Sequence, residues 1–240
     1  MKRSEVNRAI DRAKRLFTEY RFALPPWAIW SPKDWKGRYD DCREIVDCML
    51  GWDVTTFGGG DFSHRGLTAF TLRNGRPDSP QDSPPDSPPD SAPGPPGKPY
   101  GEKILVVEEE QETPMHFHAS KMEDIINRGG GNLVIQFFGS APDGTLSDKT
   151  VRLSLDGVTR IVGPGERVVL TPGESVCIVP GVYHRFFGEP GAGTVLVGEV
   201  SSVNDDTSDN YWYDDLGRFS DIEEDEPPLH LLAVDYHDYL

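Results

Sequence analysis

The chain has 240 residues, enough for one domain with a sizeable hydrophobic core and some extensions. Its 40 acidic residues outweigh 24 basic ones, a formal net charge of −16 that repels phosphate backbones and argues against nucleic acid as a partner. Three scattered cysteines cannot form a disulfide framework, and no apolar run is long enough to span a membrane, so we expect a cytoplasmic protein without a membrane partner.

The first fifty residues predict helices that lie outside the main body. Residues 4–22 carry apolar side chains at helical spacing, with Ser4 as the N-cap and the Pro25-Pro26 pair as the stop. Charged residues interrupt this stretch from its first turn onward, which excludes a signal peptide.

A second, shorter helix is expected from Asp40 to Leu50. Between the two helices, Trp27, Trp30 and Trp35 crowd a short irregular stretch. In so acidic a chain we interpret them as packing against the main body rather than as a platform for stacking bases. Residues 1–52 are thus expected to form a helical extension.

From residue 53 the pattern changes to short β-prone runs, first at 54–57 and 67–72. A proline-rich insertion then occupies about 74–99, with an imperfect repeat of Asp, Ser and Pro that cannot bury a core. We expect an extended, mobile surface loop, and a proline-rich ligand for a partner domain is the alternative. Since strands continue after it, the insertion interrupts one domain, predicted to span 53–240 and to end in an acidic tail.

The rest of the chain predicts strand after strand, divided by Gly- and Pro-containing turns. Asp156-Gly157 is the clearest hairpin signal, because this pair suits a type I′ turn. Many short strands without intervening helices indicate an all-β sandwich or barrel. The expected strands are 103–109, 114–118, 132–138, 151–155, 158–162, 167–171, 175–179, 183–187 and 194–200.

One of these strands carries a candidate metal site. His116 and His118 stand two residues apart in an extended segment, so both imidazoles point to one face while Phe117 points to the other. Glu123 follows after a turn, and His184 lies beside a later strand. Three histidines and one carboxylate suit Mn, Fe, Co, Ni or Zn better than Ca or Mg. The alternative is ordinary surface or core histidines, although three of only six histidines fall into this pattern.

These spacings resemble the two motifs of the cupin superfamily. The first, H-x-H-(x)3–4-E-(x)6-G, is matched by His116, His118, Glu123 and Gly130. The second, P-x-G-x-x-H, is matched at Gly181 and His184, with the proline one place late at Pro180. Two outer positions depart from the pattern: Glu110 replaces a glycine and Gly188 an asparagine.

The wider context resembles the D-lyxose isomerase family within the cupins. The stretches that carry this likeness are 102–105, 113–118, 121–131 and 198–206. The resemblance implies a double-stranded β-helix, that is a jelly-roll barrel, with the N-terminal helices packed outside. It also implies a homodimer, Mn2+ as the cofactor, and interconversion of the monosaccharides D-lyxose and D-xylulose, and also of D-mannose and D-fructose.

Such an isomerase moves a proton between C2 and C1 of the sugar, which requires a base near the metal. Lys121 lies between the second histidine and Glu123, where a nearby divalent cation would lower its pKa and favour proton transfer. The alternative for Lys121 is an ordinary surface lysine. Glu199 is the candidate general base or hydroxyl acceptor, with a solvated surface role as its alternative. The resemblance and position in the chain favour further residues as sugar-binding groups, each with a solvated surface role as the alternative: Lys103, Asp205, Asp206, Arg218 and Glu224.

Two other functions use the same features. The same four ligands hold Fe(II) in cupin dioxygenases, for which we would expect an apolar cavity rather than lysines and carboxylates around the metal. A non-catalytic, sugar-binding cupin is the second alternative. Such a sensor is normally fused to a DNA-binding module, and neither a helix-turn-helix pattern nor a basic stretch occurs in this sequence.

Overall fold

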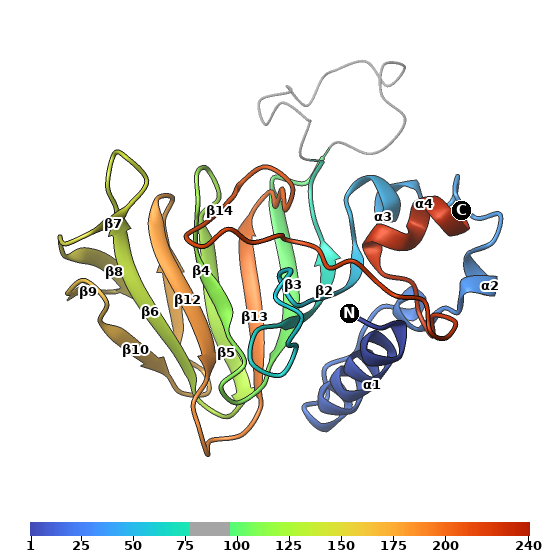
Figure 1. Ribbon diagram of the computed structural model, residues 1–240, viewed down its shortest axis with the longest axis horizontal. Coiled ribbons are helices and arrows are strands. Elements are labelled where there is room, and N and C mark those ends of the chain that lie inside the picture. The colour runs from blue at the N-terminus through green and yellow to red at the C-terminus, as the bar shows by residue number, and fades with distance from the viewer. Residues whose placement is uncertain (77–96) are drawn as a thin grey trace.

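The computed structural model describes residues 1–76 and 97–240. Two antiparallel β-sheets make up the body, and the helices gather at one end of it beside both termini (Figure 1). The proline-rich insertion, expected to form a surface loop at about 74–99, falls mostly outside the described residues. Within the described residues, no helix has both the length and the apolar character that crossing a membrane requires.

The larger sheet has eight described strands in the spatial order β1-β2-β3-β13-β5-β11-β8-β9, and neighbouring strands are antiparallel. Its strands are β1 (Gly51–Thr55), β2 (Leu67–Arg73), β3 (Tyr100–Val107), β13 (Val195–Ser202), β5 (Glu123–Gly130), β11 (Ser175–Ile178), β8 (Val151–Leu155) and β9 (Val158–Val162).

The smaller sheet runs in the order β10-β6-β12-β4-β14, with β7 added beside β6. Its strands are β10 (Arg167–Leu170), β6 (Leu133–Ser140), β12 (Val182–Gly188), β4 (Thr113–His118), β14 (Asn210–Trp212) and β7 (Leu146–Ser147). The β8–β9 turn has positive φ at both Asp156 and Gly157, which confirms the expected type I′ hairpin.

The two sheets face each other across the main hydrophobic core. Leu105 and Ile125 from the larger sheet pack with Ile135, Phe137 and Phe186 from the smaller one, and each is at most 3% exposed. Because side chains alternate along a strand, every second residue of these strands enters the space between the sheets. The expected all-β jelly-roll barrel is thereby confirmed.

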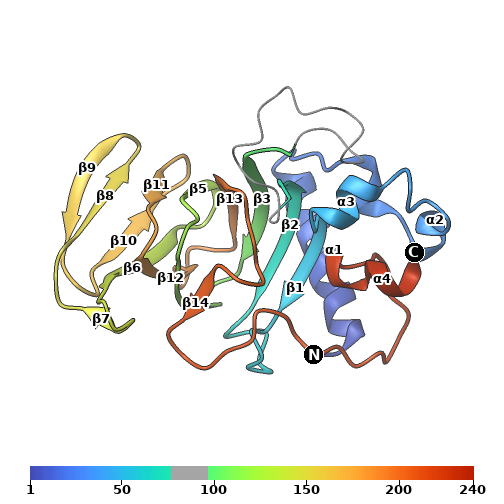
Figure 2. The ribbon, with the colours of Figure 1, turned by 90° about the horizontal axis from the view of Figure 1, so that it is seen from above.

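Helix α1 (Arg3–Glu19) covers the outer face of the larger sheet near β1 and β2, as Figure 2 shows from above. Val6, Ile10 and Phe17 lie on its buried side and contact Trp52 and Phe70 of the sheet. The Phe17 ring stacks on Trp52 with centroids 6.1 Å apart. This second core places the N-terminal helix outside the barrel, as expected.

The limits of α1 differ from the predicted 4–22. The N-cap position is Lys2, whereas the backbone N–H and the hydroxyl of Ser4 both donate to Asp225 in the C-terminal segment. At the other end Arg21 adopts φ +54°, which ends the helix before the prolines are reached. A tertiary contact and a left-handed residue therefore set both ends.

The second predicted helix, 40–50, is shorter in the structure, where α3 covers Arg43–Asp47. The packing interpretation of the tryptophans is confirmed, because Trp35 is 2% exposed and contacts Trp30 and Tyr236 with ring centroids about 5 Å apart. The remaining helical turns are η1 (Pro26–Ile29), α2 (Pro32–Trp35), η2 (Ala233–Asp235) and α4 (Tyr236–Tyr239).

Three strands were not anticipated, and one of them is the two-residue strand β7. Strand β5 begins at Glu123, where a turn was expected, and the polar stretch after residue 209 supplies the edge strand β14. Strand β1 begins at Gly51, two residues before the predicted onset of strands. The division into an extension at 1–52 and a barrel domain at 53–240 stays a prediction.

Candidate active site

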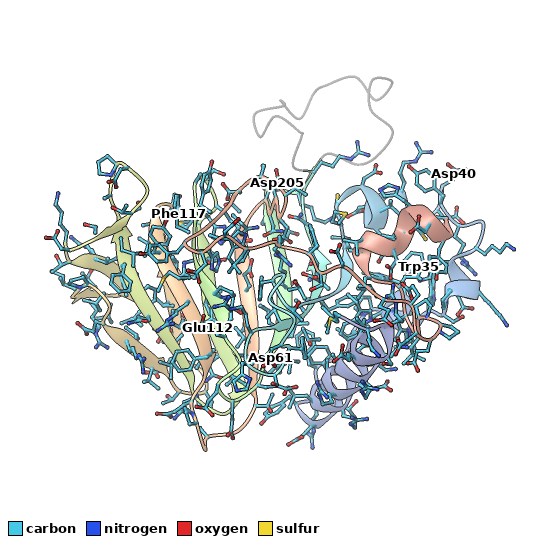
Figure 3. All side chains as sticks on the ribbon, in the orientation of Figure 1. Trp35, Asp40, Asp61, Glu112, Phe117 and Asp205 are labelled. Atoms are coloured by element: carbon cyan, nitrogen blue, oxygen red, sulfur yellow. The ribbon has the colours of Figure 1, made fainter. Side chains whose placement is uncertain are left out.

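The predicted metal ligands come together from both sheets. His116 and His118 occupy inward positions of β4, and His116 lies directly opposite His184 of the neighbouring strand β12. Glu123 enters from the first position of β5 in the other sheet. Phe117, between the two histidines, points to the outer face, where it stacks on Tyr211 (Figure 3).

The four side chains converge on one point. Nitrogen atoms of His116, His118 and His184 lie within 4.8 Å of one another. Oε1 of Glu123 lies 3.0 Å from Nε2 of His184 and 3.5 Å from Nε2 of His118. Although so close, Glu123 Oε1 and His184 Nε2 are both buried without a well-aligned hydrogen-bond partner in the described residues. Buried acceptors left unpaired in this way fit a bound cation between them.

The backbone orients two of the imidazoles for this purpose. Nδ1 of His116 lies 2.8 Å from the carbonyl oxygen of Pro114, and Nδ1 of His184 lies 3.0 Å from that of Val182. A ring that donates from Nδ1 keeps the lone pair on Nε2, the atom that faces Glu123 in His184. Hydrogen bonds of this kind fix the tautomer of metal-binding histidines.

The charge states also suit a metal. Burial, aided by the neighbouring histidines, holds the pKa of His116 well below its ordinary value, and burial likewise lowers the pKa of His118. Burial alone would raise the pKa of Glu123, but Lys121, His118 and His184 together outweigh burial and hold that pKa well below the usual range. Neutral imidazoles and an ionised carboxylate are the forms in which these side chains bind metals.

The ligands open into a small cavity of about 40 Å³ inside the barrel. Apolar side chains line part of it, and charged side chains from three strands and from connecting segments line another part. The charged residues are Lys103, Lys121, Glu123, Glu199, Asp206 and Arg218. This wall matches the one expected for a polyol substrate and differs from the apolar wall expected for a dioxygenase.

Lys121 and Glu199 form the centre of the charged wall. Nζ of Lys121 donates to Oε1 of Glu199 at 3.0 Å and lies 2.8 Å from Oε2 of Glu123. Lys121 is only 4% exposed, which excludes a surface lysine. Burial lowers its pKa, but the attraction of Glu123, Glu199 and Asp206 is stronger, so the net shift is upward. The predicted lowering of the Lys121 pKa assumed a divalent cation beside the ammonium group.

A second ionic group holds Asp206 and Arg218. Both guanidinium atoms Nε and Nη2 donate to Asp206 at 3.2 Å, and Nη2 also donates to Asp53 of β1. Lys103 donates at 3.3 Å to Oδ2 of Asp206, the oxygen that also accepts from Nη2 of Arg218. The remaining guanidinium nitrogen, Nη1, is buried without a partner among the described residues. It is therefore a free donor in the cavity wall.

Two predicted sugar-binding residues lie elsewhere. Glu224 is half exposed and pairs with Arg3 of α1 at 2.6 Å, away from the cavity lining. Asp205, which is labelled in Figure 3, closes its own turn by accepting hydrogen bonds from Thr207 and Ser208. It lines a neighbouring cavity of about 200 Å³. Sequence position placed both in the acidic tail, but position along a loop does not determine which side chains turn inward.

Several site residues were missed by the sequence reasoning. Trp212 of β14 packs on His116 with ring centroids 4.9 Å apart, and Asn210 of the same strand also lines the cavity. Asp53 holds Arg218, and Asn204 accepts a hydrogen bond from Lys121 at 3.2 Å. None belongs to a motif with ligand spacing. The only signal was the aromatic and polar character of the stretch around Trp212.

Comparison with known proteins identifies close relatives of the whole chain. The family described as D-lyxose isomerase matches residues 1–236. A D-lyxose/D-mannose isomerase of Serratia proteamaculans is 46% identical over 237 residues, covering 98% of both chains. A D-lyxose/D-mannose isomerase of Escherichia coli O157:H7 is 43% identical over 241 residues, covering both chains completely.

Solved structures show the same fold at much lower identity. L-ribose isomerase of Acinetobacter sp. DL28, in complex with L-ribose, superposes with a TM-score of 0.59 at 16% identity, covering 93% of this chain and 98% of the other. L-ribose isomerase of Geodermatophilus obscurus gives a TM-score of 0.57 at 16% identity, with the same coverage. At this level of identity the likeness concerns the fold.

Proposed function

Because the chain belongs to the D-lyxose isomerase family, we propose that it interconverts D-lyxose and D-xylulose, and D-mannose and D-fructose, in the cavity beside His116 and Lys121. The substrate class follows from the two relatives, both named D-lyxose/D-mannose isomerase. The observation that carries the proposal is the buried histidine group at a cavity walled by lysines and carboxylates.

His116, His118, Glu123 and His184 would hold a divalent transition metal. The family resemblance favours Mn2+, and Co, Ni, Zn or Fe suit the same ligands. When bound, such an ion acts as a Lewis acid toward the neighbouring oxygens at C1 and C2 of the sugar. The protein contributes ligands that are already buried, close together and in their metal-binding charge states.

Converting an aldose to a ketose moves one hydrogen from C2 to C1 and one hydroxyl proton from O2 to O1. We assign the carbon-bound proton to Glu199, which accepts it from C2 and returns it to C1. We assign the oxygen-bound proton to Lys121, whose ammonium gives a proton to O1 as the amine takes one from O2. The two groups are 3.0 Å apart, so one bound sugar can contact both of them.

Lys103, Asp206 and Arg218 would bind the hydroxyls farther from the metal. They form one connected ion group in the cavity wall, so each side chain is held by another. The buried Nη1 of Arg218 has a donor to offer, and a sugar hydroxyl is an acceptor of suitable size. Asp205 and Glu224 take no part in this assignment.

We also propose that the protein is a cytoplasmic homodimer, as the family resemblance implies, with the N-terminal region available for exchange across the interface. Light scattering after size-exclusion chromatography measures this directly. A mass twice that of the chain supports the dimer, and the mass of one chain contradicts it.

The function is tested by proton NMR of the Mn-loaded protein with D-lyxose in D2O, beside His184→Ala as control. We expect D-xylulose carrying deuterium at C1, and no product from the variant. D-Xylulose without deuterium would still support isomerase activity. It would contradict transfer of the C2 proton through a group that exchanges protons with the solvent. An absence of conversion of both D-lyxose and D-mannose would refute the proposed substrates.

A further inference from the structure

Asp209 lies behind the histidine group, where the turn after β4 meets the segment that leads into β14. Its Oδ1 accepts hydrogen bonds from the backbone N–H and the hydroxyl of Ser120 at 2.9 and 2.8 Å. Its Oδ2 accepts from the backbone N–H of Lys121 at 3.0 Å. One carboxylate therefore fastens the turn that carries His118 at one end and Glu123 at the other.

The same carboxylate faces His118, the proposed ligand whose Nδ1 has no hydrogen-bond partner in the described residues. Nδ1 of His116 and of His184 each contact a backbone carbonyl, but Nδ1 of His118 is buried without a partner among residues 1–76 and 97–240. Oδ2 of Asp209 lies 3.8 Å from it. That distance is longer than a hydrogen bond, so the contact is electrostatic in this structure.

A histidine that binds a metal through Nε2 carries its proton on Nδ1. Nε2 of His118 is the atom that faces Glu123, 3.5 Å from its Oε1. The Nδ1–H on the opposite side of the ring therefore needs an acceptor, and the free energy of burying it unpaired is unfavourable. Oδ2 of Asp209 has this capacity, because a carboxylate oxygen accepts two hydrogen bonds and, within the described part of the chain, this one receives only the N–H of Lys121.

We propose that Asp209 is a positioning residue for the metal centre and accepts the Nδ1–H of His118 when the metal is bound. This inference rests on the metal site of the proposed function. Asp209 then orients the ring, fixes its tautomer and increases the basicity of Nε2. Removal of such a partner typically weakens metal binding by about 10- to 100-fold.

The test is Asp209→Asn, with Mn2+ affinity measured by isothermal titration calorimetry on the metal-free protein. The amide oxygen retains both bonds from Ser120, while the amide nitrogen cannot accept from His118 or Lys121. We expect affinity to fall about 10- to 100-fold. The matched control is Asp156→Asn, because Oδ1 of Asp156 likewise accepts from the N–H and hydroxyl of Ser175, at 3.0 and 2.7 Å, and neither residue lines the site cavity.

A second variant separates orientation of His118 from fastening of the turn. Ser120→Ala removes one of the three bonds to Asp209 and leaves its carboxylate beside His118. We expect this variant to bind Mn2+ within about threefold of the unmodified protein. Thermal unfolding of all variants in EDTA shows whether any has lost its fold, independently of metal.

The outcomes are distinct. Weak Mn2+ binding by Asp209→Asn alone supports the proposal. Equal affinity in Asp209→Asn and the unmodified protein overturns it, as does an equal loss in Asp209→Asn and Ser120→Ala. If the unmodified protein binds no Mn2+, or binds it no better than His184→Ala, the metal centre itself is refuted, which is a failure of the proposed function rather than of Asp209.

Discussion

At the scale of single residues, Glu199 is the side chain on which the proposed proton transfer depends most. Its carboxylate is buried between two ammonium groups, 3.0 Å from Nζ of Lys121 and 3.8 Å from Nζ of Lys103. Glu199→Gln keeps the shape and the hydrogen-bonding oxygen but removes the base. We expect kcat to fall about 10²- to 10⁴-fold, measured with D-lyxose and a coupled ketose assay.

The control for this prediction is Glu102→Gln, on the neighbouring strand β3. Glu102 lies one residue before Lys103, so it points to the opposite face of the sheet, where it pairs with Arg73. This variant is expected to keep kcat within a factor of about two. Both proteins are to be matched for Mn2+ content, and a Glu199→Gln enzyme with unchanged kcat would assign the base to another group.

Glu110 occupies the position where the cupin motif has a glycine, and its backbone shows why. It adopts φ +59°, in the left-handed region that costs an ordinary residue about 1 kcal/mol relative to glycine. Its side chain is exposed. Glu110→Gly is therefore expected to raise the free energy of unfolding by about 0.5 kcal/mol, after allowance for the greater freedom of glycine in the unfolded chain.

Urea denaturation measures this difference. The comparison variant is Glu109→Gly, one residue earlier. Glu109 is not among the positive-φ residues, and its carboxylate accepts the backbone N–H groups of Gly191 and Gly193. That change should destabilise the protein. If both variants lose stability, the backbone conformation of Glu110 is not a source of strain.

At the scale of elements, α1 is joined to the C-terminal segment by the buried Arg3. The guanidinium, 2% exposed, donates to both oxygens of Asp235 at 2.9 and 3.0 Å. In Arg3→Ala the Asp235 carboxylate stays buried without its cation, which typically costs about 3–5 kcal/mol. We expect a loss of about 3 kcal/mol in the free energy of unfolding, measured by urea denaturation.

The same helix provides the control. Arg12 pairs with Glu108 at 3.0 Å, but both side chains are more than a third exposed. Exposed pairs contribute about 0–1 kcal/mol, so Arg12→Ala should change stability by less than about 0.5 kcal/mol. A similar loss of unfolding free energy in Arg3→Ala and Arg12→Ala would show that the buried ion pair is no more stabilising than the exposed one.

The elements that the sequence predicted well are those with an apolar pattern, and two of the missed strands, β5 and β14, line the site. The β8–β9 hairpin was predicted because Asp156-Gly157 determines its turn locally. Strand β5 was overlooked because its first inward position is the charged Glu123 rather than an apolar residue. Strand β14 is a three-residue edge strand whose existence depends on pairing with β4, far away in the sequence.

The residues of the site likewise divide into those that the sequence predicted and those that it missed. The four predicted ligands were recognisable because each histidine and Glu123 belongs to a motif with fixed spacing. Asp53 contacts Arg218, 165 positions away, and Asp209 contacts Ser120 and Lys121, 89 and 88 positions away. No motif with local spacing can predict contacts over such separations. Glu224 was misplaced for the converse reason: proximity in sequence to Arg218 does not bring it to the cavity.

At the scale of the whole molecule, the proposed metal would join the two sheets, because the histidines lie on the smaller sheet and Glu123 on the larger one. A ligand that binds only the folded state stabilises it, by about 2.7 kcal/mol at 100 times its dissociation constant. For a domain of this size that corresponds to a rise in Tm of about 5–10 °C. Scanning calorimetry with Mn2+ and with EDTA measures it, and His184→Ala should show a much smaller rise.

The free energy of unfolding of the metal-free protein should depend on pH, because His116 and His118 are buried. The pKa values of His116 and His118 are lowered in the folded protein, whereas the unfolded chain takes up protons near the ordinary value of 6.5. Below that pH the unfolded chain therefore binds more protons than the folded protein. The contribution of the two histidines to stability is fully present above pH 6.5 and is lost as pH falls. Two such groups reduce stability by about 2–3 kcal/mol per pH unit.

Urea denaturation in EDTA at pH 7.5, 6.5 and 5.5 tests this directly. His116→Gln should flatten the dependence, and His64→Gln, which changes a histidine with a 79% exposed side chain, should not. Because protons and metal compete for the same imidazoles, the rise in Tm caused by Mn2+ should also shrink over this interval. A metal-induced rise that stays constant from pH 7.5 to 5.5 would mean that these histidines do not bind the ion, whatever activity the protein shows.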